Sequence, residues 1–260
     1  MVEIPLDPAC AVRHRRRFMP TSVLRSSVEA GLRGARANLV PGLALQAFAL
    51  ALVVSYYQVP AVQAALQQLA VFRERTGFVY GIVATAFFGG VLPFVYLKLR
   101  SATRARFTLA QGAALTAFWA YKGLEIDLFY QFNAWLVGEG TDVSTIVFKA
   151  LVDQGVYCPI LAIPVSWIVY AWVEYQFNGR AVMQRLTAPG WYVRDVLPIL
   201  LSNVAIWVPA VTIIYLLPTP LQLPLQNIVL CFFTLLLAHL TQRPAGKTPV
   251  ARLHEQAQAA

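Results

Sequence analysis

The stretch VLPILLSNVAIWVPAVTIIYLLPTPLQLPLQNIVLCFFTLLLAHLTQ, residues 196–242, contains no aspartate, glutamate, lysine or arginine. A helix needs about 20 apolar residues to cross a hydrocarbon core about 30 Å thick, so this stretch is too long for one crossing. Its middle, LLPTPLQLP at residues 216–224, holds three prolines, which end one helix and begin another. The stretch therefore predicts a hairpin of two membrane-spanning helices.

The rest of the chain repeats this apolar pattern. Hydrophobic residues make up 58% of the sequence and charged residues 13%, whereas an average soluble domain has about 25% charged residues. The fold class predicted is all-α, a polytopic transmembrane helix bundle of about six spans over residues 39–241. The predicted spans are residues 39–57, 77–97, 107–137, 145–172, 196–215 and 221–241. The third is longer than one crossing requires, so it must tilt, bend near Gly123 or run on into the interface.

The positive charges are distributed unevenly between the predicted loops. Seventeen of the 21 lysines and arginines fall in a basic N-terminal tail (residues 1–38), in the loops after the second and fourth spans, and in a polar C-terminal tail (residues 242–260). The loops on the opposite side hold only Arg73 and Arg75. Because short basic loops stay on the cytoplasmic side, this bias predicts six spans with both termini cytoplasmic or matrix-side. It also explains the net charge of +9, so no nucleic-acid partner is expected.

Two segments outside the spans have an amphipathic pattern. Residues 61–73 place apolar side chains on one helical face, which fits either a helix in the membrane interface or a loop helix packed on the bundle. In the N-terminal tail, Leu24, Val28 and Leu32 recur every four residues beside arginines. This spacing fits either an interfacial helix on an anionic leaflet or a solvated tail.

Enzyme chemistry has the least support. The three cysteines, Cys10, Cys158 and Cys231, show no metal-binding or disulfide spacing, and the histidines lie far apart. The catalytic serine, zinc-protease and phosphate-loop motifs are absent from the sequence. We therefore expect no catalytic residue, no metal and no cofactor. The partners expected are the lipid bilayer and, as an alternative to a monomer, further copies of the same chain.

Ionisable residues inside two predicted spans are the candidate functional residues. Charge at a helix centre costs about 2.5–3.5 kcal/mol on insertion scales, so such residues are functional candidates by default. Mutually neutralising pairs that fix helix packing are an equally good interpretation. Prolines within the spans likewise either kink a packed helix or free carbonyls that line a solute path. The polar candidates are Lys122, Glu125, Asp127, Lys149, Asp153 and Gln154, with Lys149 and Asp153 sharing one helix face.

The second half of the chain resembles the Mpv-seventeen and twenty-two-kilodalton peroxisomal membrane protein family. The most specific part is KALVDQGVYCP, residues 149–159, which is similar to the lysine, aspartate-glutamine and proline pattern of that family. The chain departs from the pattern at several positions, above all in having no arginine between Arg194 and Arg243, which weakens an anion-binding role. The other residues that carry the resemblance are Gly123, Tyr130, Pro159, Asn203, Trp207, Pro209 and Pro220.

The resemblance implies a small protein of the mitochondrial inner membrane or the peroxisome that forms a pore for small solutes or ions, and a bacterial inner membrane is the alternative location. A scaffold or stress-response protein without transport is the alternative function, and a membrane-bound enzyme comes last. Asp153 is the residue on which the pore hypothesis concentrates, since it would either set ion preference or hold helices together.

Overall fold

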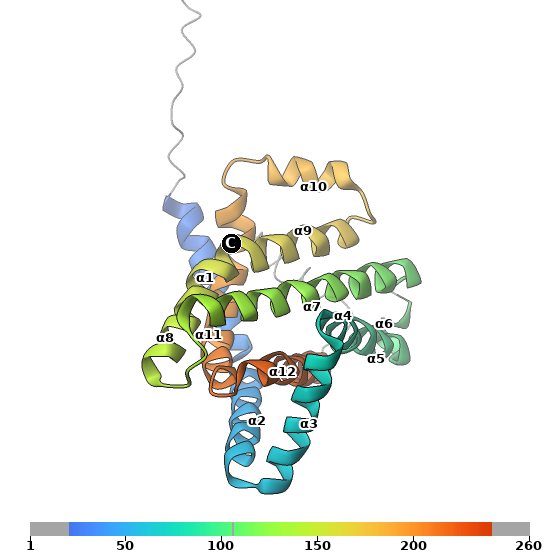
Figure 1. Ribbon diagram of the computed structural model, residues 1–260. Coiled ribbons are helices and arrows are strands. Elements are labelled where there is room, and N and C mark those ends of the chain that lie inside the picture. The colour runs from blue at the N-terminus through green and yellow to red at the C-terminus, as the bar shows by residue number, and fades with distance from the viewer. Residues whose placement is uncertain (1–20, 106, 241–260) are drawn as a thin grey trace, which may run out of the picture.

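The computed structural model describes residues 21–105 and 107–240, and every regular element in that part of the chain is a helix (Figure 1). The predicted all-α class is confirmed. The predicted C-terminal tail, residues 242–260, and the first 20 residues of the N-terminal tail lie outside the described residues.

Four helical segments are long and apolar enough to cross a membrane. They are α2 (Leu39–Gln58), the combined segment Phe78–Leu99, the combined segment Val143–Glu174, and the combined segment Tyr192–Ile214. Large apolar side chains on their outer surface are exposed, among them Val79, Ile160 and Leu151. Such an exposed apolar surface is expected of a protein whose solvent on that side is lipid.

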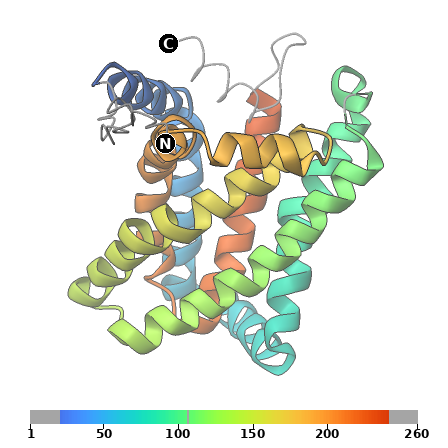
Figure 2. The ribbon, with the colours of Figure 1, turned by 90° about the horizontal axis from the view of Figure 1, so that it is seen from above.

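Two more helices run the length of the bundle, α7 (Leu109–Val137) and α12 (Thr219–Leu240), but they are not among these four. Both carry buried polar side chains, such as Asp127 on α7 and Asn227 on α12. Six crossings therefore remain a prediction. The long helix α7 is continuous through Gly123 and runs diagonally across the bundle (Figure 2), so it tilts and does not bend there.

Helices outside the long segments lie at the two ends of the bundle (Figure 2). The first end holds α1 (Thr21–Ala37), α6 (Ser101–Arg104) and α10 (Gly179–Leu186), whereas α3 (Pro60–Thr76) lies across the opposite end. Most basic residues of the described segments outside the long helices are at the first end, and α3 carries Arg73 and Arg75. The charge bias seen in the sequence is thus a bias between two ends of one structure.

The helix predicted in the N-terminal tail exists, but it contacts the bundle through a face that the apolar pattern did not indicate. Helix α1 packs against α11 (Leu197–Ile214), and its buried residues are Ser27, Ala30, Gly31 and Gly34. Leu24 and Leu32 are each 49% exposed. Small residues allow two helix backbones to approach closely, so they form the contact and the larger side chains point outward.

The amphipathic segment at residues 61–73 forms most of α3, which packs against α12 and α2. Leu66 and Ala70 contact the hydrophobic core, while Phe72 is 55% exposed. The helix is therefore packed on the bundle. Arg73, which the sequence analysis counted as a loop charge, is the buried residue of this helix.

Helix α12 lies at the centre of the core. It contacts α2, α3, α5 (Leu92–Leu99) and α7, and Leu221, Leu223, Leu225 and Val229 are at most 2% exposed. The hydrophobic core also contains Leu45 and Ala49 of α2. The predicted break between two helices is present, since α11 ends at Ile214 and α12 begins at Thr219, whereas a membrane crossing by α12 remains a prediction.

Three π-helical segments interrupt the long helices, and each ends two residues before a proline. Segment η1 ends at Val91 before Pro93, η2 at Ala162 before Pro164, and η3 at Val196 before Pro198. Proline clashes with the carbonyl four residues earlier, and the wider turn of a π-helix gives that carbonyl room. The segments involved are α4 (Phe78–Thr85), η1 (Ala86–Val91), α8 (Val143–Val152), η2 (Asp153–Ala162), α9 (Ile163–Glu174) and η3 (Tyr192–Val196).

Helices α4 and α7 touch at a pair of glycines. A Cβ atom at Gly81 would lie 2.9 Å from the Gly123 carbonyl oxygen, and a Cβ atom at Gly123 would collide with the Gly81 carbonyl group. Only glycine permits this approach, which sets where α7 crosses α4. The Gly123 of the sequence resemblance thus has a packing role.

Candidate functional site

Lys122 and Glu125 lie near the middle of α7 and face the π-helical segment η2. The Lys122 ammonium lies 2.5 Å from Glu125 Oε1, and the Tyr157 hydroxyl of η2 donates to the same oxygen over 2.5 Å. Lys122 also donates to the Tyr157 oxygen over 3.2 Å, and the Tyr157 ring stacks on Phe129 of α7 with ring centres 4.0 Å apart. Lys122 and Glu125 therefore contact the following helical segment through Tyr157, a residue that the sequence analysis did not single out.

Asp127 faces a different neighbour. Its carboxylate forms an ion pair with the Arg73 guanidinium of α3 and accepts a hydrogen bond from Gln131 Nε2 over 3.0 Å. Arg73 is 8% exposed and Asp127 is 0% exposed, so the pair is buried where α3 meets the bundle. Asp127 therefore does not join Lys122 and Glu125 in one cluster; it attaches the end helix α3 to α7.

Asp153 accepts hydrogen bonds from three uncharged side chains. Its carboxylate accepts from the Tyr215 hydroxyl over 2.6 Å, from Gln154 Nε2 over 2.9 Å and from the Cys158 thiol over 3.6 Å. Tyr215 follows α11, so this set of contacts joins η2 to α11. Asn133 of α7 donates to the Tyr215 oxygen over 3.1 Å and extends the contact to a third helix.

Lys149 and Asp153, which one interpretation of the sequence treats as a neutralising pair, do not form an ion pair. Within the described residues neither takes part in an ion pair with the other, although they are one turn apart. The i, i+4 spacing brings side chains to the same face but does not fix where they point, and the donors around Asp153 take its carboxylate. The Lys149 ammonium is 5.9 Å from the Tyr215 ring centre and has no hydrogen-bond partner among the described residues.

Helix α12 contributes buried amides that the sequence analysis missed. Gln226 accepts a hydrogen bond from the Tyr130 hydroxyl over 3.3 Å, and Asn227 accepts one from Thr85 over 2.9 Å. Gln222 donates to the Leu217 carbonyl over 3.0 Å. The signal that could have found them is three amides within six residues of an otherwise apolar span.

These contacts make up separate buried groups around Asp127, Glu125 and Asp153, which we refer to jointly as the polar network. Its ionisable members are at most 8% exposed and balance in charge, since three are basic and three acidic. Polar atoms without a described partner remain in it, including Glu125 Oε2, Asn133 Oδ1 and Gln154 Oε1. Ordered water is the usual partner of such atoms in a polar interior. The six ionisable members are Arg73, Lys122, Glu125, Asp127, Lys149 and Asp153.

The residues of the family resemblance divide between this network and the outer helices. Tyr130 and Gly123 lie beside it on α7, and the Pro159 carbonyl accepts a hydrogen bond from Tyr192 over 2.8 Å. Asn203, Trp207 and Pro209 lie along α11, where Trp207 packs against the core. Pro220 is the second residue of α12.

A separate buried carboxylate lies toward the basic end. Asp195 of η3 is 4% exposed and accepts from Arg185 of α10 over 2.8 and 3.2 Å. This hydrogen bond raises the pKa of Arg185 above its ordinary value. The fork geometry of arginine suits such a double contact, which attaches α10 to η3.

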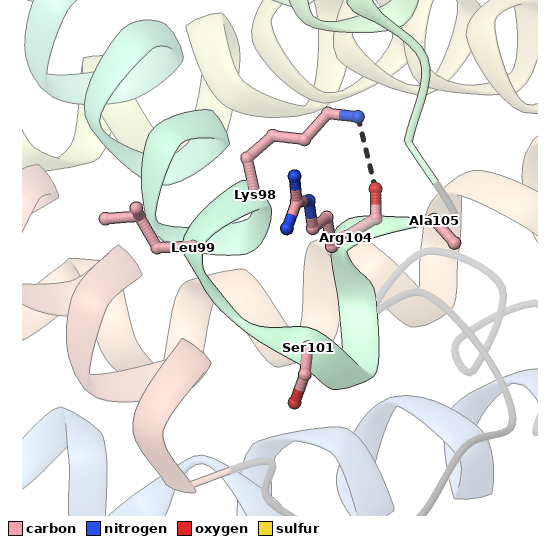
Figure 3. Close-up of a pocket in the computed structure, with 5 residues that line it drawn as sticks. All are labelled: Lys98, Leu99, Ser101, Arg104 and Ala105. Carbon is pink, nitrogen blue, oxygen red and sulfur yellow. Dashed lines mark hydrogen bonds between the residues drawn. The ribbon is translucent and has the colours of Figure 1, made fainter.

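A pocket of about 490 Å³ lies away from the polar network, at the turn between α5 and α6 (Figure 3). Its lining residues are Lys98, Leu99, Ser101, Arg104 and Ala105.

Comparison with known proteins leaves the fold and the network to be interpreted from their own chemistry. No protein-family model, curated protein or solved structure matches the chain. What the structure defines is a helical protein with four segments able to cross a membrane and a charge-balanced polar interior.

Proposed function

We propose that this chain is a polytopic membrane protein of six crossings that provides a path for small ions or solutes through its polar interior. The observation that carries the proposal is the buried polar network. Five of its six ionisable side chains lie in otherwise apolar helices and the sixth, Arg73, reaches in from the end helix α3, and all six are at most 8% exposed. Intramembrane charge is costly, so ionisable residues inside membrane-spanning helices are functional candidates by default.

The unsatisfied atoms of the network support a hydrated interior. Lys149 Nζ, Asn133 Oδ1 and Gln154 Oε1 lack partners among the described residues, and the same is true of Gln222 Oε1 and Asn227 Nδ2 on α12. Each would cost roughly 1–3 kcal/mol if it stayed dry and unpaired. Water molecules bound at these atoms would form a row of polar sites along α7, α8 and α12.

The contacts among Lys122, Glu125 and Tyr157 could close such a path. Glu125 is clamped between Lys122 and Tyr157 at 2.5 Å, which brings α7 and η2 together. Separation of these two segments would open the polar interior. The π-helical turns of η2 support a functional role for this segment, because π-bulges are frequent at functional sites in helices.

We further propose that the chain is a divergent member of the family it resembles. Support comes from the position of the matching residues, since Lys149, Asp153, Gln154 and Tyr130 all lie in or beside the network. On this proposal the location is the mitochondrial inner or peroxisomal membrane, with a bacterial inner membrane as the alternative.

The test is reconstitution of the purified full chain into liposomes, with ion conductance and release of small solutes read from the same preparation. We expect ion conductance above protein-free liposomes. The control variant is Arg180→Gln, which removes an exposed charge on α10 outside the network and should conduct as the wild type does. Folded, reconstituted protein that passes neither ions nor solutes and co-purifies with a partner would instead identify a scaffold. The hydrogen bonds that saturate Asp153 favour that second function, because they also suit a purely structural role.

A further inference from the structure

The pocket at the α5–α6 turn has a cationic wall. Figure 3 shows the Lys98 amine reaching over the turn, with the Arg104 guanidinium beside it. The Lys98 ammonium donates to the Arg104 carbonyl oxygen over 3.1 Å and lies 5.7 Å from the centre of the Phe94 ring. Two of its three N–H groups are left for another acceptor.

The two cations of the pocket are not neutralised by the described protein. Among residues 21–105 and 107–240, neither Lys98 nor Arg104 forms an ion pair, and the lining residues include no carboxylate. Two like charges that share one pocket repel each other, so an anion between them would be favoured. A guanidinium and an ammonium together are suited to the oxygens of a phosphate group.

An apolar track leads away from the same pocket. Leu99, which lines the pocket, is 81% exposed, and Val95 one turn earlier is 43% exposed. The i, i+4 spacing puts both on one outer face of α5, within a segment apolar enough to cross a membrane. On the neighbouring turn Arg100 lies 5.4 Å from the Tyr96 ring centre, an aromatic and basic pair typical of the membrane interface.

We propose that this pocket binds the phosphate-bearing head group of an anionic phospholipid, with Lys98 and Arg104 on the phosphate and an acyl chain along Val95 and Leu99. The pocket volume of about 490 Å³ is sufficient for a head group. It lies at the basic end of the bundle, where an anionic leaflet is expected. A phospholipid would use both the basic pocket and the exposed apolar helix face beside it, whereas a free phosphate ion would need the basic pocket alone. The combination therefore favours a lipid as the ligand. This site is independent of the path through the polar network.

The test is binding of fluorescent phosphatidylglycerol to the full chain in detergent micelles, with unlabelled phosphatidylcholine as competitor. We expect phosphatidylglycerol to resist this competitor, and Lys98→Gln/Arg104→Gln to weaken its binding by about tenfold or more, since each basic residue near an anionic surface contributes about 1 kcal/mol. Arg180→Gln, at the same end, and Arg75→Gln, at the opposite end, should bind as the wild type does. Arg104 is exposed and Lys98 is half-buried, and neither belongs to a hydrophobic core cluster, so the core should stay intact, which equal melting temperatures check.

A second comparison separates a lipid from free phosphate. Val95→Asn/Leu99→Asn should weaken phosphatidylglycerol binding, and inorganic phosphate at a concentration matched to the lipid should not displace it. Displacement by phosphate with no effect of the apolar changes would show a free-phosphate site and overturn the lipid proposal. Equal displacement of phosphatidylglycerol by the two unlabelled phospholipids in the wild type would overturn it without any variant.

Discussion

Asp153 and Lys149 lie one turn apart on the same helix, yet the structure gives them different surroundings. Asp153 accepts hydrogen bonds from Tyr215, Gln154 and Cys158, whereas the Lys149 ammonium lies over the Tyr215 ring without a hydrogen-bond partner among the described residues. Asp153 is therefore an anchor between helices as well as a charge. Lys149 is a buried charge whose cost is not offset by a described hydrogen bond.

Replacement of the two buried lysines by methionine should have opposite effects on stability. Lys149→Met removes an unpartnered ammonium, so we expect an unchanged or raised melting temperature in detergent. Lys122→Met leaves Glu125 buried without its cation, which typically costs about 3–5 kcal/mol for a buried pair. A thermal melt of each variant checks this. Equal losses in both would show that Lys149 has a partner that the contacts described here do not include.

Variants of Arg73 and Arg75, two arginines of α3, test the Arg73–Asp127 ion pair, with Arg75 as the control. Arg73→Gln should lower stability by about 3–5 kcal/mol, because it leaves Asp127 buried and unpaired, whereas Arg75 is exposed and its replacement should change stability by less than about 0.5 kcal/mol. Chemical or thermal unfolding in micelles measures both. Similar losses for the two variants would contradict the burial of the Arg73–Asp127 pair.

At the scale of the helices, glycines and prolines determine how the elements meet. The Gly81–Gly123 contact sets the crossing of α4 and α7, and the three prolines that follow η1, η2 and η3 coincide with their π-helical turns. Both effects are local consequences of residue type. Their positions in space, however, depend on partners far away in the chain.

Gly123→Ala and Gly155→Ala compare a crowded glycine with an open one. A Cβ atom at Gly123 meets the Gly81 backbone, whereas one at Gly155 has no atom within 4 Å. We expect Gly123→Ala to destabilise the protein by about 1–3 kcal/mol through overpacking. Gly155→Ala should be neutral or stabilising by up to about 1 kcal/mol, because alanine is the better helix former. Melting temperatures of the two variants decide the matter, and a loss confined to Gly155→Ala would refute the packing described here.

The sequence predicted the helical elements more fully than their partners. Long uncharged runs and proline pairs located the helices, because apolar length and helix breaking are local properties. Arg73 was read as a loop charge and Tyr157 was not considered, because their roles depend on contacts with α7 that span 54 and 32 residues. The Lys149–Asp153 pair, one of the two interpretations of these residues, is not formed, because spacing along one helix allows a contact but does not require it, and other donors hold the carboxylate.

On the scale of the whole molecule, the course of the helices between two ends predicts a topology. The basic helices α1, α6 and α10 lie at one end and α3 at the other (Figure 2). Reporter fusions at Gly140 and Thr219 should therefore report the side opposite to the termini. Fusions after Ser101 and Arg180 serve as controls for the side of the termini. Some reporters work only on the side of the membrane where the termini lie. Activity of such a reporter fused at Gly140 or Thr219 would contradict six crossings.

The most direct test of the central claim, that ions pass through the polar network, is the reversal potential of wild type and Asp153→Asn in planar bilayers under a salt gradient. Asparagine keeps the shape and an oxygen for Tyr215 but removes the charge. The wild type should conduct. Asp153→Asn should also conduct, with a reversal potential shifted away from the equilibrium potential of the cation, which indicates a weaker preference for cations. Identical reversal potentials, or no conductance from folded wild-type protein, would contradict a path through this network.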